Sequence, residues 1–322
     1  MKEPQPIRLE LPTQFQMKTV NSFLIKEPEV TLIDCGEDSE ETWLALESEL
    51  KENGLTVQDV ERIIITHAHV DHMGMAQRIS KHAQAPVWVS DKVQAWALDP
   101  ESMFRSRGKL IQDTMKTLLG ENVFTQIFPI VFAFGSKMND SWKPIDPTNL
   151  RVFPHEGSLE IGEETWDVLY VPGHSTTQSC FYQANSGYLL SADMLLSITS
   201  APVIEYHEGS TKRARALQEH LSSFKRLKEL QISKVFPGHY HTFENADALI
   251  EAQIRRITQR KEQCFQLIQQ GDTDFFTLFS KMYPKANFPG MNMLVGYLDL
   301  LEDERKIVLE PAFPDPIHIQ VT

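Results

Sequence analysis

Apolar residues follow two different spacings along the first third of the chain. Residues 21–36, NSFLIKEPEVTLIDCG, hold two β-prone runs on either side of a Glu-Pro-Glu segment, which predicts a β-hairpin. Residues 40–54 place apolar side chains near helical spacing and stop at a glycine, as a helix does. The β-branched run at 60–66 predicts a buried strand, and a helix (74–85) and a strand (86–90) follow. This alternation predicts layers of sheet covered by helices.

Residues 92–148 interrupt that alternation. Aromatic and methionine side chains recur there, mostly at helix-like spacing: Trp96, Met103, Phe104, Met115, Phe124, Phe128, Phe132 and Phe134. We therefore predict a helical insertion. It could form an apolar cap over a substrate cleft, because long insertions in compact domains are often functional lids. A structural decoration with its own small core, or a contact between two copies of the chain, would explain the pattern too.

Strand patterns return between residues 150 and 192, in the runs LRVFPH, TWDVLYVPGH, SCFYQAN and GYLLSAD. A charged helix at 211–230 and a strand at 234–239 follow. From about residue 244 the pattern changes to three amphipathic helices and two short strands, RKIVLE and PIHIQV. We predict a first domain at 1–243, which contains the 92–148 insertion, and a small winged-helix-like unit at 244–322.

Composition narrows the class of protein. The 322 residues are 41% hydrophobic and carry a net charge of -13, a balance that disfavours nucleic acid and anionic membranes as partners. The cysteines, Cys35, Cys180 and Cys264, are too widely spaced for a CxxC metal site. No apolar run approaches the roughly 20 residues of a membrane span, and the N-terminus lacks the apolar segment of a signal peptide. We expect a soluble, cytoplasmic protein.

Histidines and aspartates gather where predicted strands end. In THAHVDH, His67 and His69 lie on one side of an extended chain, because successive side chains point to opposite faces. Asp71 and His72 follow at the start of a helix. The motifs VPGHS and FPGHYH each place a histidine directly after Pro-Gly, and LLSAD ends another strand with an aspartate; these residues are His174, His239 and Asp193. Imidazole and carboxylate groups in this arrangement indicate a metal site.

In type and order these residues resemble the metallo-β-lactamase superfamily over most of residues 16–241. The resemblance implies an α+β fold, a four-layer αββα sandwich with metals at one edge of two sheets. It implies one metal held by His67, His69 and His174, a second held by Asp71, His72 and His239, and Asp193 as the bridge. Asp34, in LIDCG, stands where the family has a carboxylate that orients a ligand histidine; its other reading is a turn residue.

The ligand set points to one part of the superfamily. True β-lactamases of the relevant subclass have cysteine where this chain has Asp193, so the pattern resembles the glyoxalase II, lactonase and processing-nuclease branches. We expect two divalent ions, zinc first, with iron or manganese as alternatives. A hydroxide shared by the metals would attack a carbonyl carbon or a phosphorus, and Asp71 could accept a hydrogen bond from it. The leading hypothesis is hydrolysis of a small ester, thioester or lactone, with a homo-oligomer as one option.

A metal-dependent endoribonuclease or phosphodiesterase is the alternative. The tail resembles that of β-lactamase-like endoribonucleases, yet residues 244–322 carry 8 Lys/Arg against 12 Asp/Glu. The best basic patch is the helix with Lys212, Arg213, Arg215, Lys225, Arg226 and Lys228, and such a helix is more often a solvated face. Nucleic acid is therefore not the expected partner. A non-catalytic metal-binding scaffold is the third reading, which the complete ligand set disfavours.

Overall fold

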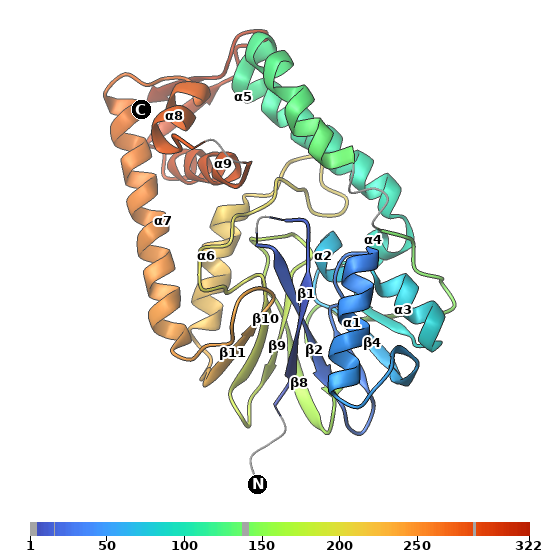
Figure 1. The fold of residues 1–322 in the computed structure, drawn as a ribbon. Coiled ribbons are helices and arrows are strands. Elements are labelled where there is room, and N and C mark those ends of the chain that lie inside the picture. The colour runs from blue at the N-terminus through green and yellow to red at the C-terminus, as the bar shows by residue number, and fades with distance from the viewer. Residues whose placement is uncertain (1–4, 16, 137–141, 286–287) are drawn as a thin grey trace.

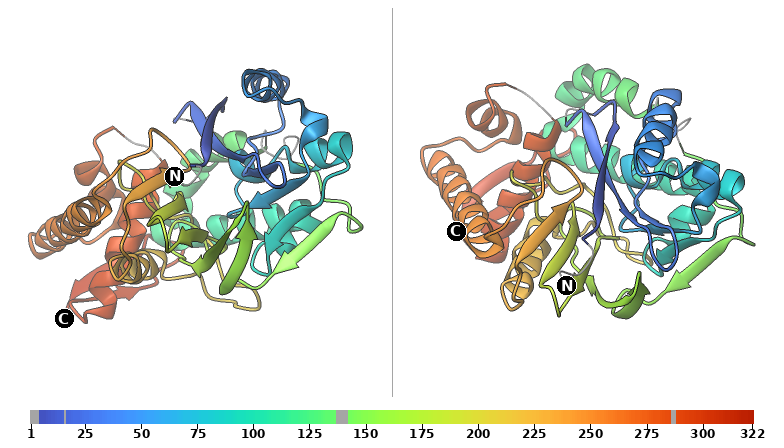
Figure 2. Two further views of the ribbon diagram at one scale, coloured as in Figure 1. Left: turned by 90° about the horizontal axis from the view of Figure 1, so that it is seen from below. Right: turned by 60° about the horizontal axis from the view of Figure 1, so that its bottom comes forward.

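The computed structural model describes residues 5–15, 17–136, 142–285 and 288–322. Two β-sheets face each other between outer layers of helix (Figures 1 and 2). Among the described residues, the first sheet has the order β1-β2-β3-β4-β5-β6 and the second the order β11-β10-β9-β8-β7. The first comprises β1 (Ile7–Pro12), β2 (Thr19–Ile25), β3 (Thr31–Ile33), β4 (Arg62–Ile65), β5 (Val87–Ser90) and β6 (Leu150–Phe153). The second comprises β7 (Gly157–Ile161), β8 (Glu164–Tyr170), β9 (Ser179–Gln183), β10 (Tyr188–Ala192) and β11 (Lys234–Pro237).

Buried apolar side chains of the described residues fall into three clusters, one at each contact between layers. The cluster between the sheets contains Ile64 of β4 and Phe181 of β9. A second lies between the first sheet and the helices α1 (Glu40–Glu52) and α3 (Ala76–Ala83). The third lies between the second sheet and α6 (Ala216–Leu227), and it continues into the tail. This is an αββα arrangement, the fold class that the sequence predicts.

Parallel pairing decides where the candidate residues lie. Strands β3, β4, β5 and β6 run parallel, so their carboxyl ends meet at one edge. The predicted hairpin is confirmed, because β2 pairs antiparallel with β3. Strands β1 and β7 are present in addition to the predicted strands. Helix α6 is shorter than the predicted 211–230, because residues 211–215 form no helix and direct two arginines toward the tail.

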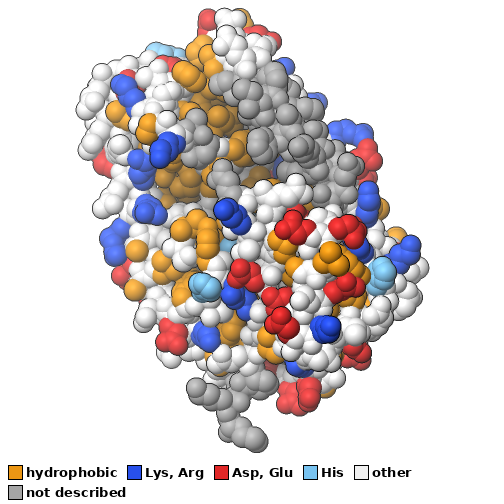
Figure 3. Space-filling view, viewed as in Figure 1, with side chains coloured by type: hydrophobic (Ala, Val, Ile, Leu, Met, Phe, Trp, Pro, Cys, Tyr) orange, Lys and Arg blue, Asp and Glu red, His pale blue; other side chains and the backbone are white. Residues whose placement is uncertain are grey.

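The insertion is helical, as predicted, and comprises α4 (Gln94–Leu98) and α5 (Pro100–Ser136). Helix α5 lies at the upper end of the molecule in Figure 1, the end that the tail also occupies. It is interrupted at Gly120, and the next N–H, that of Glu121, donates to the Pro314 carbonyl at 2.8 Å. Apolar side chains are visible between α5 and the tail in Figure 3. The side chains of 127–136, with Phe128, Phe132 and Phe134, lie outside the described residues.

The tail contains α7 (Ala246–Gln269), α8 (Phe275–Met282), α9 (Phe288–Asp303) and a ribbon of β12 (Ile307–Glu310) with β13 (His318–Val321). Its predicted elements are therefore present. Ile250 of α7 and Leu294 of α9 share a buried cluster with Phe224 of α6, so no layer of solvent separates the tail from the second sheet. The boundary near 243 and the likeness to a winged helix stay predictions. Among the described helices, none is long and apolar enough to cross a membrane.

Candidate metal centre

The sheet edge brings together every histidine and aspartate that the sequence nominates. His67 and His69 follow β4, and the short helix α2 (Val70–Met73) carries Asp71 and His72. His174, Asp193 and His239 follow β8, β10 and β11 respectively. Residues from both sheets therefore meet at one place, although they are up to 172 positions apart in the chain.

Three imidazoles form the first group. His67 Nε2 lies 3.0 Å from His69 Nδ1, which lies 3.0 Å from His174 Nε2. His67 is fully buried and His174 is 8% exposed. The three nitrogens come close enough to hold one metal ion. His69 presents Nδ1 where the other two present Nε2.

Asp193 lies between the first group and a second one. Its Oδ2 is 3.4 Å from His174 Nε2 and 3.3 Å from His239 Nε2, and its Oδ1 is 3.4 Å from His72 Nε2. Asp71 completes the second group, with Oδ2 3.4 Å from His239 Nε2. The carboxylate of Asp193 thus lies close to histidine nitrogens of both groups.

The outward nitrogens of the histidines show which nitrogen carries the proton. His72 Nδ1 lies 2.8 Å from Asp34 Oδ2, and His239 Nδ1 lies 2.6 Å from the Thr19 carbonyl. Because both partners only accept, each Nδ1 is the donor, and each Nε2 is the nitrogen left to face the cluster and a metal ion. His174 Nδ1 likewise faces away from the cluster, 2.9 Å from the carbonyl of Ala201 and 2.7 Å from the Ser200 hydroxyl.

The inward atoms indicate that a cation fits here. His72 Nε2, His239 Nε2 and Asp193 Oδ1 are buried without a hydrogen-bond partner. Buried polar atoms are normally satisfied, and lone pairs that converge on one point are satisfied by a positive charge. Imidazole and carboxylate donors suit zinc and also iron or manganese. The residues present therefore fit divalent metal ions.

The pKa values in the metal-free protein follow from burial and from the charges that oppose it. Burial would raise the pKa of Asp71, but His72 and His239 outweigh it and lower that pKa to about 2. Burial acts to lower the pKa of His239, while Asp193 outweighs it and raises that pKa to about 10. Burial lowers the pKa of His174 to about 4. Asp71 is thus ionised at neutral pH, and a proton on His239 competes with a metal ion.

Asp34 is placed to orient His72. It follows β3 with a φ of 61°, a conformation that aspartate tolerates better than most residues. Besides its contact with His72, its carboxylate accepts from the backbone N–H of Thr66 at 2.9 Å and from the Thr66 hydroxyl at 2.8 Å. A buried carboxylate behind a histidine favours the tautomer that a metal ligand needs.

The two Pro-Gly motifs need glycine for different reasons. Gly173 has a φ of 145°, and a Cβ there would lie 2.4 Å from the Cα of His220. Gly238 has no positive φ, but a Cβ would lie 2.3 Å from Asp193 Oδ1 and 2.8 Å from His72 Cε1. At Gly173 the requirement is therefore a backbone conformation that glycine adopts without strain. At Gly238 the requirement is space for the neighbouring side chains.

Sequence reasoning missed Glu205, which is buried beside the first group. Its Oε1 lies 3.8 Å from His69 Nε2 and accepts from Arg107 of α5 at 3.1 Å. Burial would raise the pKa of Glu205, but His69 and Arg107 outweigh it and lower that pKa. The residue belongs to a stretch without regular structure, between β10 and α6, and no motif marks it.

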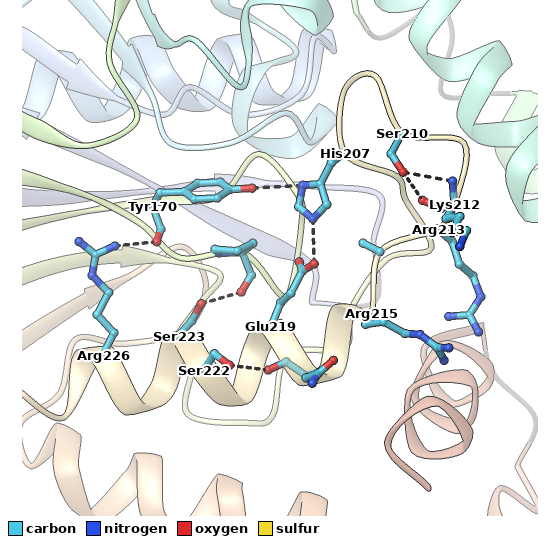
Figure 4. Close-up of a pocket in the computed structure, with 13 residues that line it drawn as sticks. Tyr170, His207, Ser210, Lys212, Arg213, Arg215, Glu219, Ser222, Ser223 and Arg226 are labelled. Carbon is cyan, nitrogen blue, oxygen red and sulfur yellow. Dashed lines mark hydrogen bonds and ion pairs between the residues drawn. The ribbon is translucent and has the colours of Figure 1, made fainter. Parts of the chain in front are cut away.

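A polar groove lies between the second sheet and α6 (Figure 4). His207 faces Glu219 at 2.8 Å on one side and the Tyr170 hydroxyl at 3.4 Å on the other. The basic patch predicted on this helix is largely neutralised. Arg213 and Arg215 pair with Asp299, Arg226 pairs with Glu156, and Lys228 pairs with Glu251.

Comparison with known proteins agrees with this geometry. A model of the metallo-beta-lactamase superfamily matches residues 17–239, so the chain belongs to that superfamily. It is 27% identical over 307 residues to the probable metallo-hydrolase YqjP of Bacillus subtilis, covering 94% of this chain and 93% of that protein.

Two solved structures share the fold. A metallo-beta-lactamase family protein from Thermus thermophilus superposes with a TM-score of 0.81 at 23% identity, over 98% of each chain. A beta-lactamase domain protein from Burkholderia ambifaria superposes with a TM-score of 0.79 at 19% identity, over 100% of this chain and 94% of that one. Because these matches span nearly the whole chain, they include the insertion and the tail.

Proposed function

We propose that this protein is a binuclear metal-dependent hydrolase that acts on a small ester, thioester or lactone. The observation that carries the proposal is the position of Asp193, whose carboxylate lies within 3.4 Å of histidine nitrogens from both groups. Membership of the superfamily and the likeness to a probable metallo-hydrolase support hydrolysis. In this proposal His67, His69 and His174 would hold one ion, Asp71, His72 and His239 would hold the other, and Asp193 would bridge them.

The bound ions, zinc in the first place, would supply a hydroxide at neutral pH and positive charge opposite the oxygen that becomes negative. Asp71 is ionised at that pH, so it can accept a hydrogen bond from the attacking water and aim it. Asp34 and the Thr19 carbonyl hold His72 and His239 in one tautomer. Burial of the cluster excludes bulk water, which strengthens each of these interactions.

The substrate class rests on charge and on the insertion. The protein has a net charge of -13, and the arginines beside the polar groove already pair with carboxylates. A polyanion needs unpaired cations to replace its counterions. In Figure 1 helix α5 lies above α2, the helix that carries Asp71 and His72, and Arg107 of α5 contacts Glu205 beside His69. This supports a cap above a pocket for a small substrate.

A nuclease is the second candidate, because the tail has the helices and ribbon expected of a winged-helix-like unit. Its test is salt dependence: a nuclease binds RNA less tightly as salt rises, with a steep slope.

We place the protein in the cytoplasm, and three buried cysteines without disulfides are consistent with a reducing compartment.

The deciding experiment combines elemental analysis with hydrolysis of p-nitrophenyl esters, thioesters, lactones and a short RNA. We expect about two metal ions per chain, as in two-metal sites, and turnover of a carbonyl substrate. Asp193→Ala should lose one ion and most activity, whereas Asp167→Asn, an exposed position on β8, should behave as wild type. Turnover of RNA alone would favour the nuclease. Full activity in Asp193→Ala would contradict the site, and two ions without any turnover would favour a scaffold.

A further inference from the structure

We propose that Glu205 is a positioning residue for His69, and that Arg107 of the helical insertion holds Glu205 in place. The inference rests on the proposed metal site and adds two residues to it. Its consequence is that the insertion forms part of the metal centre through a single buried ion pair. Three independent sets of contacts carry it.

The first set concerns the outward nitrogen of His69. With Nδ1 directed at the first group, His69 needs its proton on Nε2, which is buried and has no hydrogen-bond partner. Glu205 Oε1 lies 3.8 Å from that nitrogen. This distance is beyond a direct hydrogen bond. It is still short enough for the negative charge to favour a proton on Nε2 and a free lone pair on Nδ1.

The second set fixes the Glu205 side chain, which is 4% exposed. Its Oε2 accepts from the Thr176 N–H at 2.8 Å, the Thr176 hydroxyl at 2.9 Å and the Ser175 hydroxyl at 2.9 Å. All three donors belong to the two residues that directly follow His174. The loop that carries Glu205 is therefore tied to the segment that carries a second candidate ligand, and Oε1 is left to face His69 and Arg107.

The third set fixes Arg107, whose side chain is 12% exposed. Its guanidinium lies over the rings of Trp96 at 4.6 Å and Phe104 at 4.9 Å. Trp142 packs against both rings. Aromatic side chains of the insertion thus hold the arginine, and the arginine donates to Glu205 Oε1 at 3.1 Å. Planar stacking together with a charge-assisted hydrogen bond suits arginine better than lysine.

The test measures metal affinity in the full-length protein, by titrating the metal-free form with Zn²⁺ against a chelator and by recording the visible spectrum with Co²⁺. Glu205→Gln should weaken one of the two sites by about 10- to 100-fold and alter the Co²⁺ spectrum. Arg107→Gln should shift both readouts in the same direction by less, and Arg107→Lys should recover part of the loss. If Arg107 acts through Glu205, the double variant should be no weaker than Glu205→Gln alone.

Matched controls lie close by in the chain. Arg105 is on the same helix, is 76% exposed and pairs with Glu101, so Arg105→Gln should keep the wild-type affinity. Glu208 is exposed on the Glu205 loop, and Glu208→Gln should do the same. If Glu205→Gln does not fold, the Arg107 series carries the test.

The inference would be overturned if Glu205→Gln, or both Arg107 variants, kept the Zn²⁺ affinity and the Co²⁺ spectrum of the wild type. This holds even if the substitution lowered the free energy of unfolding. Additive losses in the double variant would break the link between the two residues. A wild-type protein that binds no metal would instead remove the proposed function, and this inference with it.

Discussion

Asp34→Asn separates the two readings of Asp34, which are orientation of a histidine and formation of a turn. The substitution keeps the size of the side chain, and asparagine also tolerates the positive φ of 61°. The backbone should therefore be unchanged. What changes is the set of acceptors: Asp34 takes hydrogen bonds from His72 Nδ1 and from two donors of Thr66, all at 2.8–2.9 Å.

The size of the effect follows from those contacts. Asparagine has one oxygen and a donating NH₂ group, so at least one of the three donors would face another donor. A hydrogen bond to a charged group contributes about 1.5–3 kcal/mol, and an orphaned buried donor costs about 1–3 kcal/mol. We expect the metal-free protein to lose about 3 kcal/mol of unfolding free energy. Metal affinity should fall by about 10- to 100-fold, because His72 would no longer be held in one tautomer.

Two measurements check this prediction. Urea unfolding in the presence of a chelator gives the stability of the metal-free protein, and chelator competition gives the affinity for Zn²⁺. Asp167→Asn, at an exposed position, is the control and should stay within about 0.5 kcal/mol of wild type. A stability loss with unchanged metal affinity would leave Asp34 as a turn residue. Wild-type values in both assays would refute the reasoning altogether.

Three further predictions use other parts of the structure. Gly238→Ala should lower Zn²⁺ affinity at least about tenfold, because its Cβ would lie 2.3 Å from Asp193 Oδ1; normal affinity in chelator competition would contradict this. Glu219 raises the pKa of His207 above its ordinary value. The His207–Glu219 pair therefore stabilises the folded protein fully below pH ~6.5, and this contribution is lost as the pH rises through the higher pKa of His207 in the folded state. His207→Gln should therefore lower the free energy of unfolding more at pH ~5.5 than at pH ~9, with a difference of less than about 1 kcal/mol between the two. The same loss at both pH values in urea unfolding would argue against the His207–Glu219 pair. Asp299→Asn should lower the free energy of unfolding by about 3 kcal/mol, because the Asp299 carboxylate is 3% exposed and pairs with Arg213 and Arg215. An unchanged free energy in urea unfolding would show that water takes the place of the carboxylate beside the two arginines.

Much of the fold could be predicted from local patterns. The run of isoleucines before His67 is apolar on both faces, as a strand buried between two layers must be. Spacing and a terminal glycine likewise predicted the helix observed at Glu40–Glu52. Strand β7 (Gly157–Ile161) escaped prediction because most of its residues are exposed or half-buried, so it lacks an apolar run.

The candidate centre was accessible because its chemistry is unusual in sequence. Histidine and aspartate placed after several strands would be costly if they were buried without a common partner. The family pattern then suggested a role for each of them. Glu205 and Arg107 carry no such mark, since a glutamate in a loop and an arginine on a helix are ordinary surface residues until the chain folds.

The sequence by itself therefore determined the residue types of the candidate centre, their order and the strands that present them. Those properties are written in local periodicity and in side-chain chemistry. Only the tertiary structure decided which nitrogen of His69 faces the cluster, why Gly238 has no room for a Cβ, and that Arg107 reaches Glu205. These are contacts between segments as far as 166 residues apart, from His72 to Gly238. They depend on how the sheets and the insertion pack, and no local pattern encodes that packing.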